Sequence, residues 1–349
     1  MGNLGRFLTV FSIVAGVLLA GPPGKEGLSM GEEVSFSAKP IFVLLYHPYE
    51  EGFEPAFRSH LQWLKENGYE TVSLETLIDY LAGESVFLPE KPILLTFDDG
   101  TLEDHTLVYP LLREFGYTGV AFVITDHSFI KTSKKSWWRE VDRAGTLRIE
   151  SHSDSHGLVW LGPEIVDFYS GEVSDLYPLV KGFDPGLGAP IYEYGYELVS
   201  ERYFPDRRIA HVCVEYVAER GGKDFLEQEE WEEELYRLVE GFRNDHRERG
   251  RQESPLQRER RLKKELYGSK GKIERMIGQG KEVLFFAYPW GVHDEGLILE
   301  LKKYGYRGAL TIDDGENYPG DDPFRIRRIT ITSRMTAEDI ASILTSPTR

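Results

Sequence analysis

Two short polar motifs contain the residue types that a hydrolytic metal site needs. The first is Asp98-Asp99-Gly100, and the second is a His-Ser-Asp-Ser-His sequence that runs from His152 to His156. Two close carboxylates repel each other, which favours one bound to a cation and one free to accept a proton. Two histidines four residues apart can bind one ion from a helical turn or a tight loop. Together they predict a three-ligand site suited to the hydrolysis of an amide.

The position of the two motifs matters more than their composition. An Asp-Asp-Gly sequence alone is also typical of an acidic turn that caps the next helix, and a His pair at this spacing also arises by chance. Here one motif follows the apolar run 93–97 and the other follows the apolar run 147–151. Neighbouring residues of a strand face opposite sides, so Asp98 and Asp99 can share a pocket only if the chain leaves the strand there. Gly100 permits that departure.

The apolar segments along the chain predict the elements that carry these motifs. Nearly continuous apolar strands alternate with helical segments, which indicates an α/β fold with a parallel sheet covered on both faces. We expect a distorted (β/α) barrel of about seven parallel strands, with the polar motifs at the carboxyl ends of the strands. The clearest strands are 41–47, 93–97, 119–124, 147–151, 283–288 and 308–312.

One long stretch breaks this alternation. Residues 161–262 begin with a Gly-, Pro- and Tyr-rich sequence and continue with a very charged, helix-like run. We interpret them as a helical insertion within a barrel that spans residues 38–345, forming a lid or a wall of the substrate groove. Their charges are typical of a solvated helix face.

Composition excludes several classes of protein and of site. The 41 Lys and Arg residues against 58 Asp and Glu residues give a net charge of −17, which argues against nucleic acid or an anionic membrane as the main partner. Cys213 is the single cysteine, so one chain can form neither a disulfide nor a cysteine-based zinc site. Any metal ligands must therefore be histidines and carboxylates.

The first 25 residues differ from the remainder. The apolar run 7–21 follows a single charged residue, Arg6, and fits the apolar core of a signal peptide. An uncleaved N-terminal membrane anchor is the alternative. Either interpretation predicts an exported protein that is periplasmic, on the cell surface or secreted. We expect this segment to be its only contact with a membrane.

The two motifs resemble those of a known family. Thr-Phe-Asp-Asp-Gly ending at Gly100, followed by the His-Ser-Asp-Ser-His sequence, is similar to the polysaccharide deacetylases that share the NodB-type domain, carbohydrate esterase family 4. The resemblance covers about 41–160 and 265–335. It implies that Asp98 is the general base and that Asp99, His152 and His156 bind a divalent metal. Zn²⁺ is favoured, and Co²⁺, Ni²⁺ and Fe²⁺ are compatible with the same ligands.

A third segment, 286–291, resembles the family motif that forms one side of the groove. It implies that Tyr288, Pro289 and Trp290 contact the substrate, with the backbone N–H of Trp290 near the oxyanion. Its Ala-Tyr-Pro-Trp-Gly sequence is similar to the branch that acts on poly-β-1,6-N-acetylglucosamine. A Tyr-His pair that ends at His47 is common in the same branch.

Two family features are missing from their usual places. Many members have, in the third motif, an arginine that orients the catalytic aspartate, and this chain has Ala287 there. Arg325, Arg327 or Arg328 could replace it, although we expect each of them on a solvated strand edge.

The usual general acid is also missing, because no histidine follows His293 in the chain. His47, at the end of a strand, and His293, just after the third motif, are the two candidates for that role. The alternative interpretation of His47 is a core residue bonded to a neighbour.

The resemblance implies a metal-dependent hydrolase that removes acetyl groups from N-acetylated glycans, giving free amine and acetate. The expected substrate is a polysaccharide that contains N-acetylglucosamine. Two alternatives remain open, namely an O-acetyl esterase acting on an acetylated glycan and a non-catalytic glycan-binding relative.

Overall fold

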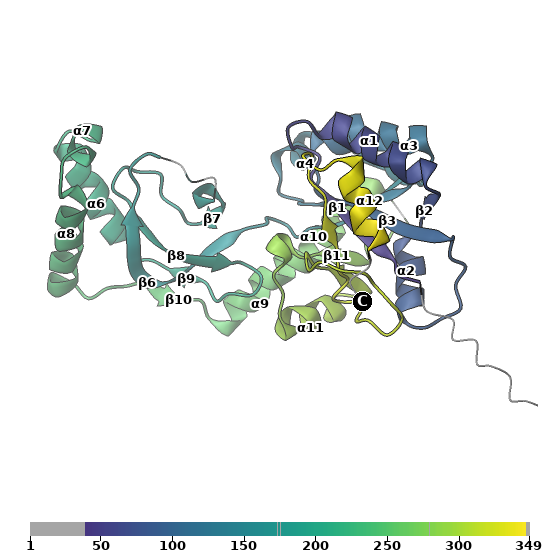
Figure 1. Ribbon diagram of the computed structural model, residues 1–349. Coiled ribbons are helices and arrows are strands. Elements are labelled where there is room, and N and C mark those ends of the chain that lie inside the picture. The colour runs from purple at the N-terminus through teal and green to yellow at the C-terminus, as the bar shows by residue number, and fades with distance from the viewer. Residues whose placement is uncertain (1–38, 173, 175, 279, 347–349) are drawn as a thin grey trace, which may run out of the picture. The chain divides into compact units, whose positions relative to one another are not determined.

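The structure is a computed structural model that describes residues 39–346 except 173, 175 and 279. Its main sheet has seven parallel strands in the order β12-β11-β5-β4-β3-β1-β13, and β2 (Tyr69–Thr71) pairs with β3 beside this path (Figure 1). The sheet curls into a half-barrel, which confirms the predicted fold class. Its strands are β1 (Phe42–Tyr46), β3 (Lys91–Asp99), β4 (Gly119–Val123), β5 (Leu147–Ser151), β11 (Phe285–Ala287), β12 (Gly308–Leu310) and β13 (Ile329–Thr330).

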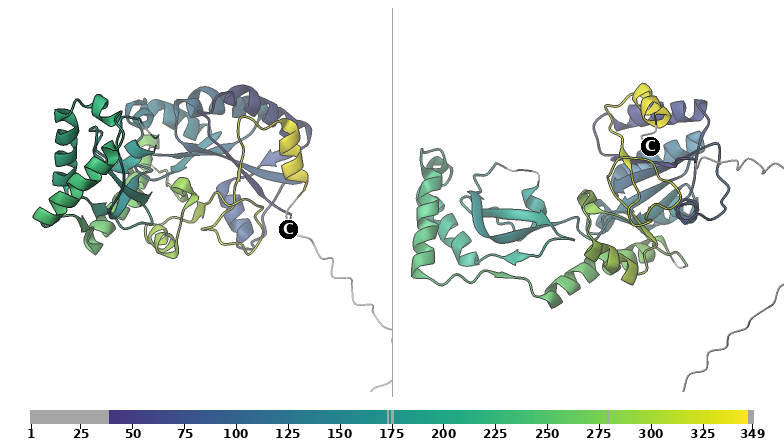
Figure 2. Two further views of the ribbon diagram at one scale, coloured as in Figure 1. Left: turned by 60° about the vertical axis from the view of Figure 1, so that its left-hand side comes forward. Right: turned by 60° about the horizontal axis from the view of Figure 1, so that its bottom comes forward.

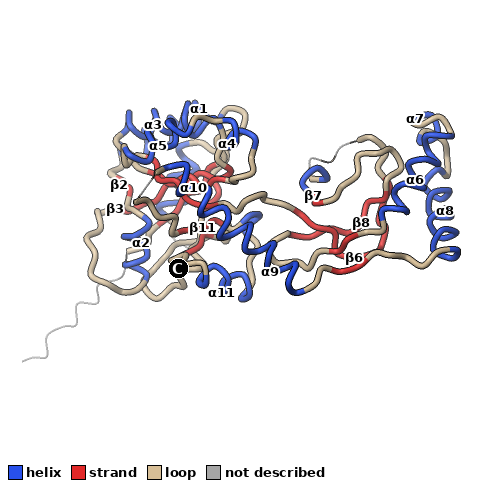
Figure 3. The backbone as a smooth tube through the Cα atoms, turned by 180° about the vertical axis from the view of Figure 1, so that it is seen from behind, coloured by secondary structure: helices blue, strands red, loops and turns tan. Residues whose placement is uncertain are grey.

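Helices cover this sheet, as Figure 3 shows for the strands at its centre. The helix α1 illustrates why they form, because Phe57, Leu61 and Leu64 repeat at helical spacing and are fully buried. The helices of the barrel are α1 (Phe53–Glu66), α2 (Leu74–Leu81), η1 (Asp104–Val108), α3 (Tyr109–Phe115), α4 (Ser128–Thr132), α5 (Lys135–Arg143), η3 (Lys264–Gly268), α10 (Ser269–Ile277), η4 (Pro289–Gly291), α11 (Glu295–Lys303) and α12 (Ala337–Thr345).

Strands β3, β4 and β5 are consecutive in the sheet. Asp99 pairs with Val123 of β4, and Val123 pairs with Ser151 of β5. The strand that ends in the two aspartates and the strand that precedes His152 therefore finish at the same edge of the sheet, with one strand between them. This register brings the two polar motifs together, as the sequence predicted.

The insertion has a core of its own, built around Trp160, Tyr192, Cys213, Val217 and Leu235. Its strands and helices are drawn in teal and green in Figure 2. It contains a three-stranded sheet in the order β7-β6-β8, a two-stranded sheet and several helices. These elements are β6 (Leu158–Phe168), η2 (Tyr177–Leu179), β7 (Val180–Lys181), β8 (Pro190–Tyr196), β9 (Tyr203–Phe204), α6 (Arg207–Glu219), α7 (Lys223–Leu226), α8 (Trp231–Asp245), β10 (Arg251–Gln252) and α9 (Pro255–Lys263).

The sheet of the insertion was not predicted, because we expected a helical segment. Its longest strand, β6, pairs with β8 through two irregularities, which lie between Trp160 and Ile165 and between Ile165 and Asp167. Such bulges break the alternation of apolar and polar residues from which a half-buried strand is predicted. The strand also begins at Leu158, three residues before the predicted boundary.

The segment 1–25, predicted to be a signal peptide or an anchor, lies outside the residues that the structure describes. Among the helices of the described part of the chain, none is long and apolar enough to span a membrane.

Candidate active site

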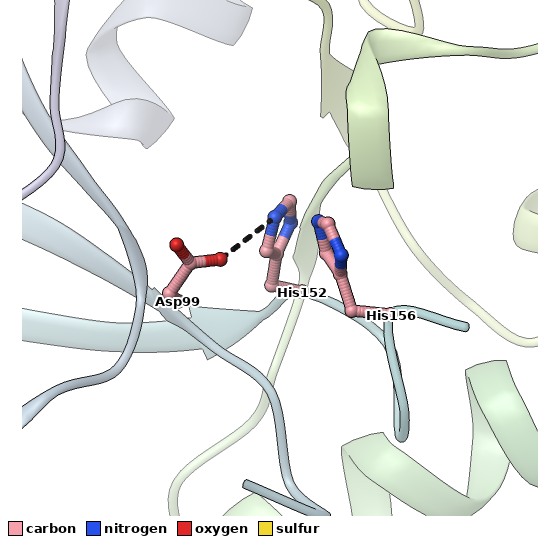
Figure 4. A group of neighbouring side chains, drawn as sticks. All are labelled: Asp99, His152 and His156. Atoms are coloured by element: carbon pink, nitrogen blue, oxygen red, sulfur yellow. Dashed lines mark ion pairs between the residues drawn. The ribbon is translucent and has the colours of Figure 1, made fainter. Parts of the chain in front are cut away.

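Asp99, His152 and His156 point toward one another at the edge of the main sheet (Figure 4). One ligand atom from each of the three side chains lies within 4.8 Å of those of the other two. Nε2 of His152 is 3.7 Å from Oδ1 of Asp99. Two imidazoles and one carboxylate fit a catalytic divalent metal, because they leave coordination positions for water and substrate. The three residues predicted as ligands therefore form a possible metal site.

Both histidines have an imidazole in a state that can bind a metal ion. Nδ1 of His152 lies 2.9 Å from the carbonyl oxygen of Ala287, so this nitrogen donates to the carbonyl and leaves the Nε2 lone pair free. Burial, together with the neighbouring His152, lowers the pKa of His156 to about 3. His156 is therefore a neutral imidazole at physiological pH, as a ligand must be.

Backbone strain is concentrated at this site. Asp99, Ser153, His156 and Trp290 have positive φ angles of 80°, 69°, 52° and 61°, and Glu230 is the only other non-glycine residue with a positive φ in the described part of the chain. Such conformations cost on the order of 1–3 kcal/mol each and persist where the surrounding structure enforces them. Four of five at one site is the pattern expected of a functional centre.

The turn after β3 differs in detail from the prediction. The chain leaves the extended conformation at Asp99 itself, with φ 80°, and Gly100 follows with φ 74°. This turn allows Asp98 and Asp99 to face one pocket although they are adjacent. A Cβ atom on Gly100 would lie 2.7 Å from Cβ of Val123, so glycine is required here by space as well as by its backbone angle.

Arg328 binds the predicted base, Asp98. Its Nη1 and Nη2 donate to Oδ1 and Oδ2 of Asp98 at 2.8 Å each, and its Nε donates to the carbonyl of Thr311 at 2.7 Å. Arg328 is fully buried, so the expectation that it lies on a solvated strand edge was wrong. It follows Ile326, which is also fully buried, by two residues, so both side chains face inward just before β13.

The ion pair with Arg328 keeps the carboxylate of Asp98 charged. Burial by itself would raise the pKa of the carboxyl, but the Arg328 guanidinium and the neighbouring His152 outweigh burial and hold the pKa at about 2. Asp98 is therefore ionised at neutral pH. Its Oδ2 lies 3.8 Å from Nε2 of His152, so it stands beside the possible metal site with its proton-accepting oxygens fixed in place.

Buried carboxylates hold the loop that carries the two histidines. Glu265 accepts hydrogen bonds from the backbone N–H groups of Asp154 and Ser155, at 3.1 and 2.9 Å. The Ser155 hydroxyl lies within hydrogen-bond distance of the carboxylates of both Glu265 and Glu197. Nζ of Lys181 lies 3.5 Å from Oε2 of Glu197. Burial, together with the neighbouring Glu197, raises the pKa of Glu265 to about 7. Glu197 and Lys181 belong to the insertion, so the insertion supports the loop directly.

The site opens into a cavity of about 1030 Å³. Of the residues predicted to bind substrate or to catalyse, Asp98, His47, Tyr288 and Trp290 line it. Tyr288 is fully buried and donates its hydroxyl to the carbonyl of Phe324 at 3.0 Å. Pro289 is buried beside Trp290 and lines a separate small pocket.

The two candidates for the general acid lie in different surroundings. His47 follows β1 and lines the cavity, with its ring 5.7 Å from that of Tyr49. His293 stacks on Tyr288 at 4.8 Å with Nδ1 3.1 Å from the carbonyl of Gly291, and it is not among the residues that line the cavity. The structure therefore brings His47, and not His293, to the pocket that holds Asp98.

Several residues of the site were not predicted. Glu265 and Glu197 carry no motif, and only their burial identifies them. Tyr196 and Leu179 reach the cavity from the insertion, for which no substrate-binding residue was predicted. The burial of Arg328 had one signal in the sequence, namely that Phe324, Ile326 and Arg328 follow one another at a spacing of two, as residues on one face of a strand do.

Comparison with known proteins agrees with these motifs. Residues 86–164 match the family model described as polysaccharide deacetylase. A putative polysaccharide deacetylase of Bacillus subtilis, YxkH, is 30% identical over 122 residues, which are 33% of this chain and 42% of that protein. A poly-beta-1,6-N-acetyl-D-glucosamine N-deacetylase of Escherichia coli is 42% identical over 65 residues, which are 19% of this chain and 10% of that protein. The chain thus spans less than half the length of either relative.

The fold has a counterpart among solved structures. A de-N-acetylase from Aggregatibacter actinomycetemcomitans superposes with a TM-score of 0.57 and 20% identity, over 87% of this chain and 100% of that chain. At this identity the similarity is one of fold. The motifs and the match over residues 86–164 agree, and this part of the chain resembles a polysaccharide deacetylase domain.

Proposed function

We propose that this protein is a metal-dependent hydrolase that removes acetyl groups from N-acetylated glycans, with a polymer of N-acetylglucosamine as its substrate. The observation that carries the proposal is the position of Asp98, an ionised carboxylate fixed by Arg328 within 3.8 Å of the His152 imidazole. A base beside a possible metal site is the arrangement that amide hydrolysis requires. A glycan-binding protein without activity has no need of it.

The residues divide the reaction between them. Asp99, His152 and His156 would hold the cation, which supplies Lewis-acid chemistry by polarising a carbonyl and lowering the pKa of water. Asp98 accepts a proton from the water that attacks the acetyl carbon. The backbone N–H of Trp290 donates to the oxygen that becomes negatively charged.

The second half of the reaction needs an acid. His47 lines the cavity from the end of β1, and we assign to it the protonation of the sugar nitrogen as the carbon–nitrogen bond breaks. Water is consumed, acetate leaves, and the glycan keeps a free amine. Asp98 then releases its proton to solvent and His47 takes one up, which restores both groups.

The polymer and the location of the protein are also proposals. The 42% identity over 65 residues to a poly-beta-1,6-N-acetyl-D-glucosamine N-deacetylase supports a β-1,6-linked substrate. The apolar run at residues 7–21 supports export to the periplasm, the cell surface or the medium. A neutral glycan also suits a chain with a net charge of −17.

Substitution of one predicted ligand tests the proposal. We expect Asp99→Ala to abolish both Zn²⁺ binding and acetate release, because two imidazoles alone bind the ion weakly. Zn²⁺ affinity is measured by competition with a chromophoric chelator, and acetate release is measured on N-acetylated and O-acetylated oligosaccharides in parallel.

Glu295→Ala provides the control, because this carboxylate is mostly exposed and belongs to a surface ion pair. An Asp99→Ala protein with wild-type Zn²⁺ affinity or turnover would contradict the ligand assignment. Release by the wild-type protein from O-acetylated substrates alone would replace the N-deacetylase by an O-acetyl esterase.

A further inference from the structure

Nearly half of the exposed large apolar side chains in the described part of the chain line the active-site cavity. The structure describes eleven large hydrophobic residues as exposed, and five of them line this one cavity. A folded protein exposes apolar groups together where it binds something. The five are Tyr49, Leu102, Leu179, Tyr196 and Ile312.

Two of these side chains come from the insertion rather than from the barrel. Leu179 lies in the short helix η2, and Tyr196 is the last residue of β8. Tyr196 is 41% exposed, whereas Trp160, Tyr192 and Tyr203 of the same insertion are 1 to 5% exposed. Packing within the core of the insertion therefore explains these three aromatic residues but not Tyr196.

Tyr196 continues a row of rings that begins at the metal site. The His156 ring lies 4.5 Å from the Trp290 ring, and the Trp290 ring lies 6.2 Å from that of Tyr196. Trp290 also packs against the apolar core of the insertion. Tyr196 thus stands one ring farther from the predicted ligand His156 than the aromatic residue of the third motif does.

The backbone fixes Tyr196 in this position. It pairs with Leu158, two residues after His156, in the antiparallel ladder of β6 and β8. The next residue, Glu197, is 3% exposed, donates its N–H to the carbonyl of Gly157 at 3.1 Å and accepts from the Ser155 hydroxyl. The backbone at Tyr196 is therefore fixed before a ligand binds, which reduces the entropy cost of binding.

We propose that Tyr196, with Leu179 lining the same cavity, forms a subsite that binds the pyranose ring next to the residue being deacetylated, and so selects glycan chains over single sugars. The apolar C–H face of a sugar ring packs against an aromatic ring by dispersion. No Lys or Arg is among the residues that line the cavity in the described part of the chain, so the subsite suits a neutral sugar rather than an anionic one. The choice of substrate rests on the proposed function.

Two variants of one residue test the subsite. Acetate release is followed with Zn²⁺-loaded protein on N-acetylglucosamine and on its oligomers, both β-1,6- and β-1,4-linked. We expect Tyr196→Ala to raise KM for the oligomers roughly tenfold while kcat stays close to that of the wild type. The single sugar should be unaffected, and Tyr196→Phe should restore the wild-type KM.

Tyr236→Ala is the matched control. Tyr236 belongs to the same insertion and is 40% exposed, but it packs on Phe168 and does not line the cavity. It should leave the KM for every substrate unchanged. Two results for Tyr196→Ala would overturn the subsite. One is an equal loss of kcat/KM on the single sugar and on the oligomers, and the other is an unchanged KM for the oligomers.

A second measurement separates the subsite from the proposed function. Binding of the same oligomers to chelated, inactive protein is measured by calorimetry for the wild type and the Tyr196 variants. If the wild type releases no acetate, and the Tyr196→Ala variant binds the oligomers less tightly than the wild type does, the proposed function fails and the subsite stands. If the wild type releases acetate, and the Tyr196→Ala variant has the same affinity and the same KM for the oligomers as the wild type, the subsite fails and the proposed function stands.

Discussion

Asp98→Asn is expected to lower kcat for acetate release by about 10²–10⁴-fold, the usual contribution of a general base. The amide is nearly the same size as the carboxylate, but it cannot accept the proton of the attacking water. Zn²⁺ affinity should remain close to that of the wild type, because the predicted ligands are Asp99, His152 and His156. This separation of turnover from metal binding is the signature of a base that is not a ligand.

The test of Asp98 needs a control for stability, because the neutral amide would leave the buried Arg328 without a counter-ion. Asp206 provides one, since it is also buried, also forms a two-point pair with an arginine, Arg208, and also has a pKa of about 2. Asp206→Asn should lower the melting temperature without lowering kcat. Rates are compared at a temperature at which circular dichroism shows every variant folded. An Asp98→Asn protein with a kcat near that of the wild type would contradict the assignment.

Arg328→Met is expected to lower the free energy of unfolding by about 3–5 kcal/mol at pH 7, the usual cost of leaving a buried charge without its partner. The double variant Asp98→Asn, Arg328→Met removes both charges and should recover most of this stability. Turnover should fall in the single variant as well, because Asp98 loses the two hydrogen bonds that fix its oxygens. Urea denaturation and acetate release measure the two effects separately.

The pH dependence of the Arg328 variant has a definite sign. In the wild type the pKa of Asp98 is about 2, below the ordinary 3.8, so the pair adds stability above pH 3.8 that is lost as the pH falls toward 2. Without Arg328, burial raises the pKa of Asp98, so the variant gains stability as the carboxyl becomes protonated at lower pH. The difference in stability between the two proteins should therefore shrink from about pH 7 to about pH 4.

Arg325→Met is the matched control for this experiment. Arg325 lies in the same segment but is 40% exposed, and it pairs with the exposed carboxylates of Glu295 and Asp322. Exposed pairs contribute about 0–1 kcal/mol, so little change is expected. Equal effects of the Arg325 and Arg328 substitutions, or no recovery in the double variant, would contradict the role of the buried pair.

The barrel and its possible metal site were predictable from the sequence because they depend on local patterns. Continuous apolar runs mark buried parallel strands, and the polar motifs after β3 and β5 come together wherever those strands are near neighbours in one sheet. His152 and His156 are four residues apart, so both predicted histidine ligands come from one short loop, and predicting the position of that loop places them both.

The remainder of the site depends on contacts between distant segments, which no local pattern encodes. Arg328 reaches Asp98 across 230 residues, and Glu265 reaches Ser155 across 110. The insertion was mistaken for a helical segment because its strands are irregular. Tyr196 therefore had no predicted role, although it lines the cavity. These residues can be recognised only once the strand order and the register of β6 and β8 are known.

The most direct test of the central claim is acetate release from N-acetylglucosamine oligomers by chelated protein, before and after the addition of Zn²⁺ or Co²⁺. The account predicts no release from the chelated protein and full release after the metal is restored, with β-1,6-linked oligomers preferred to β-1,4-linked ones. The absence of release on both linkages with either metal would contradict it.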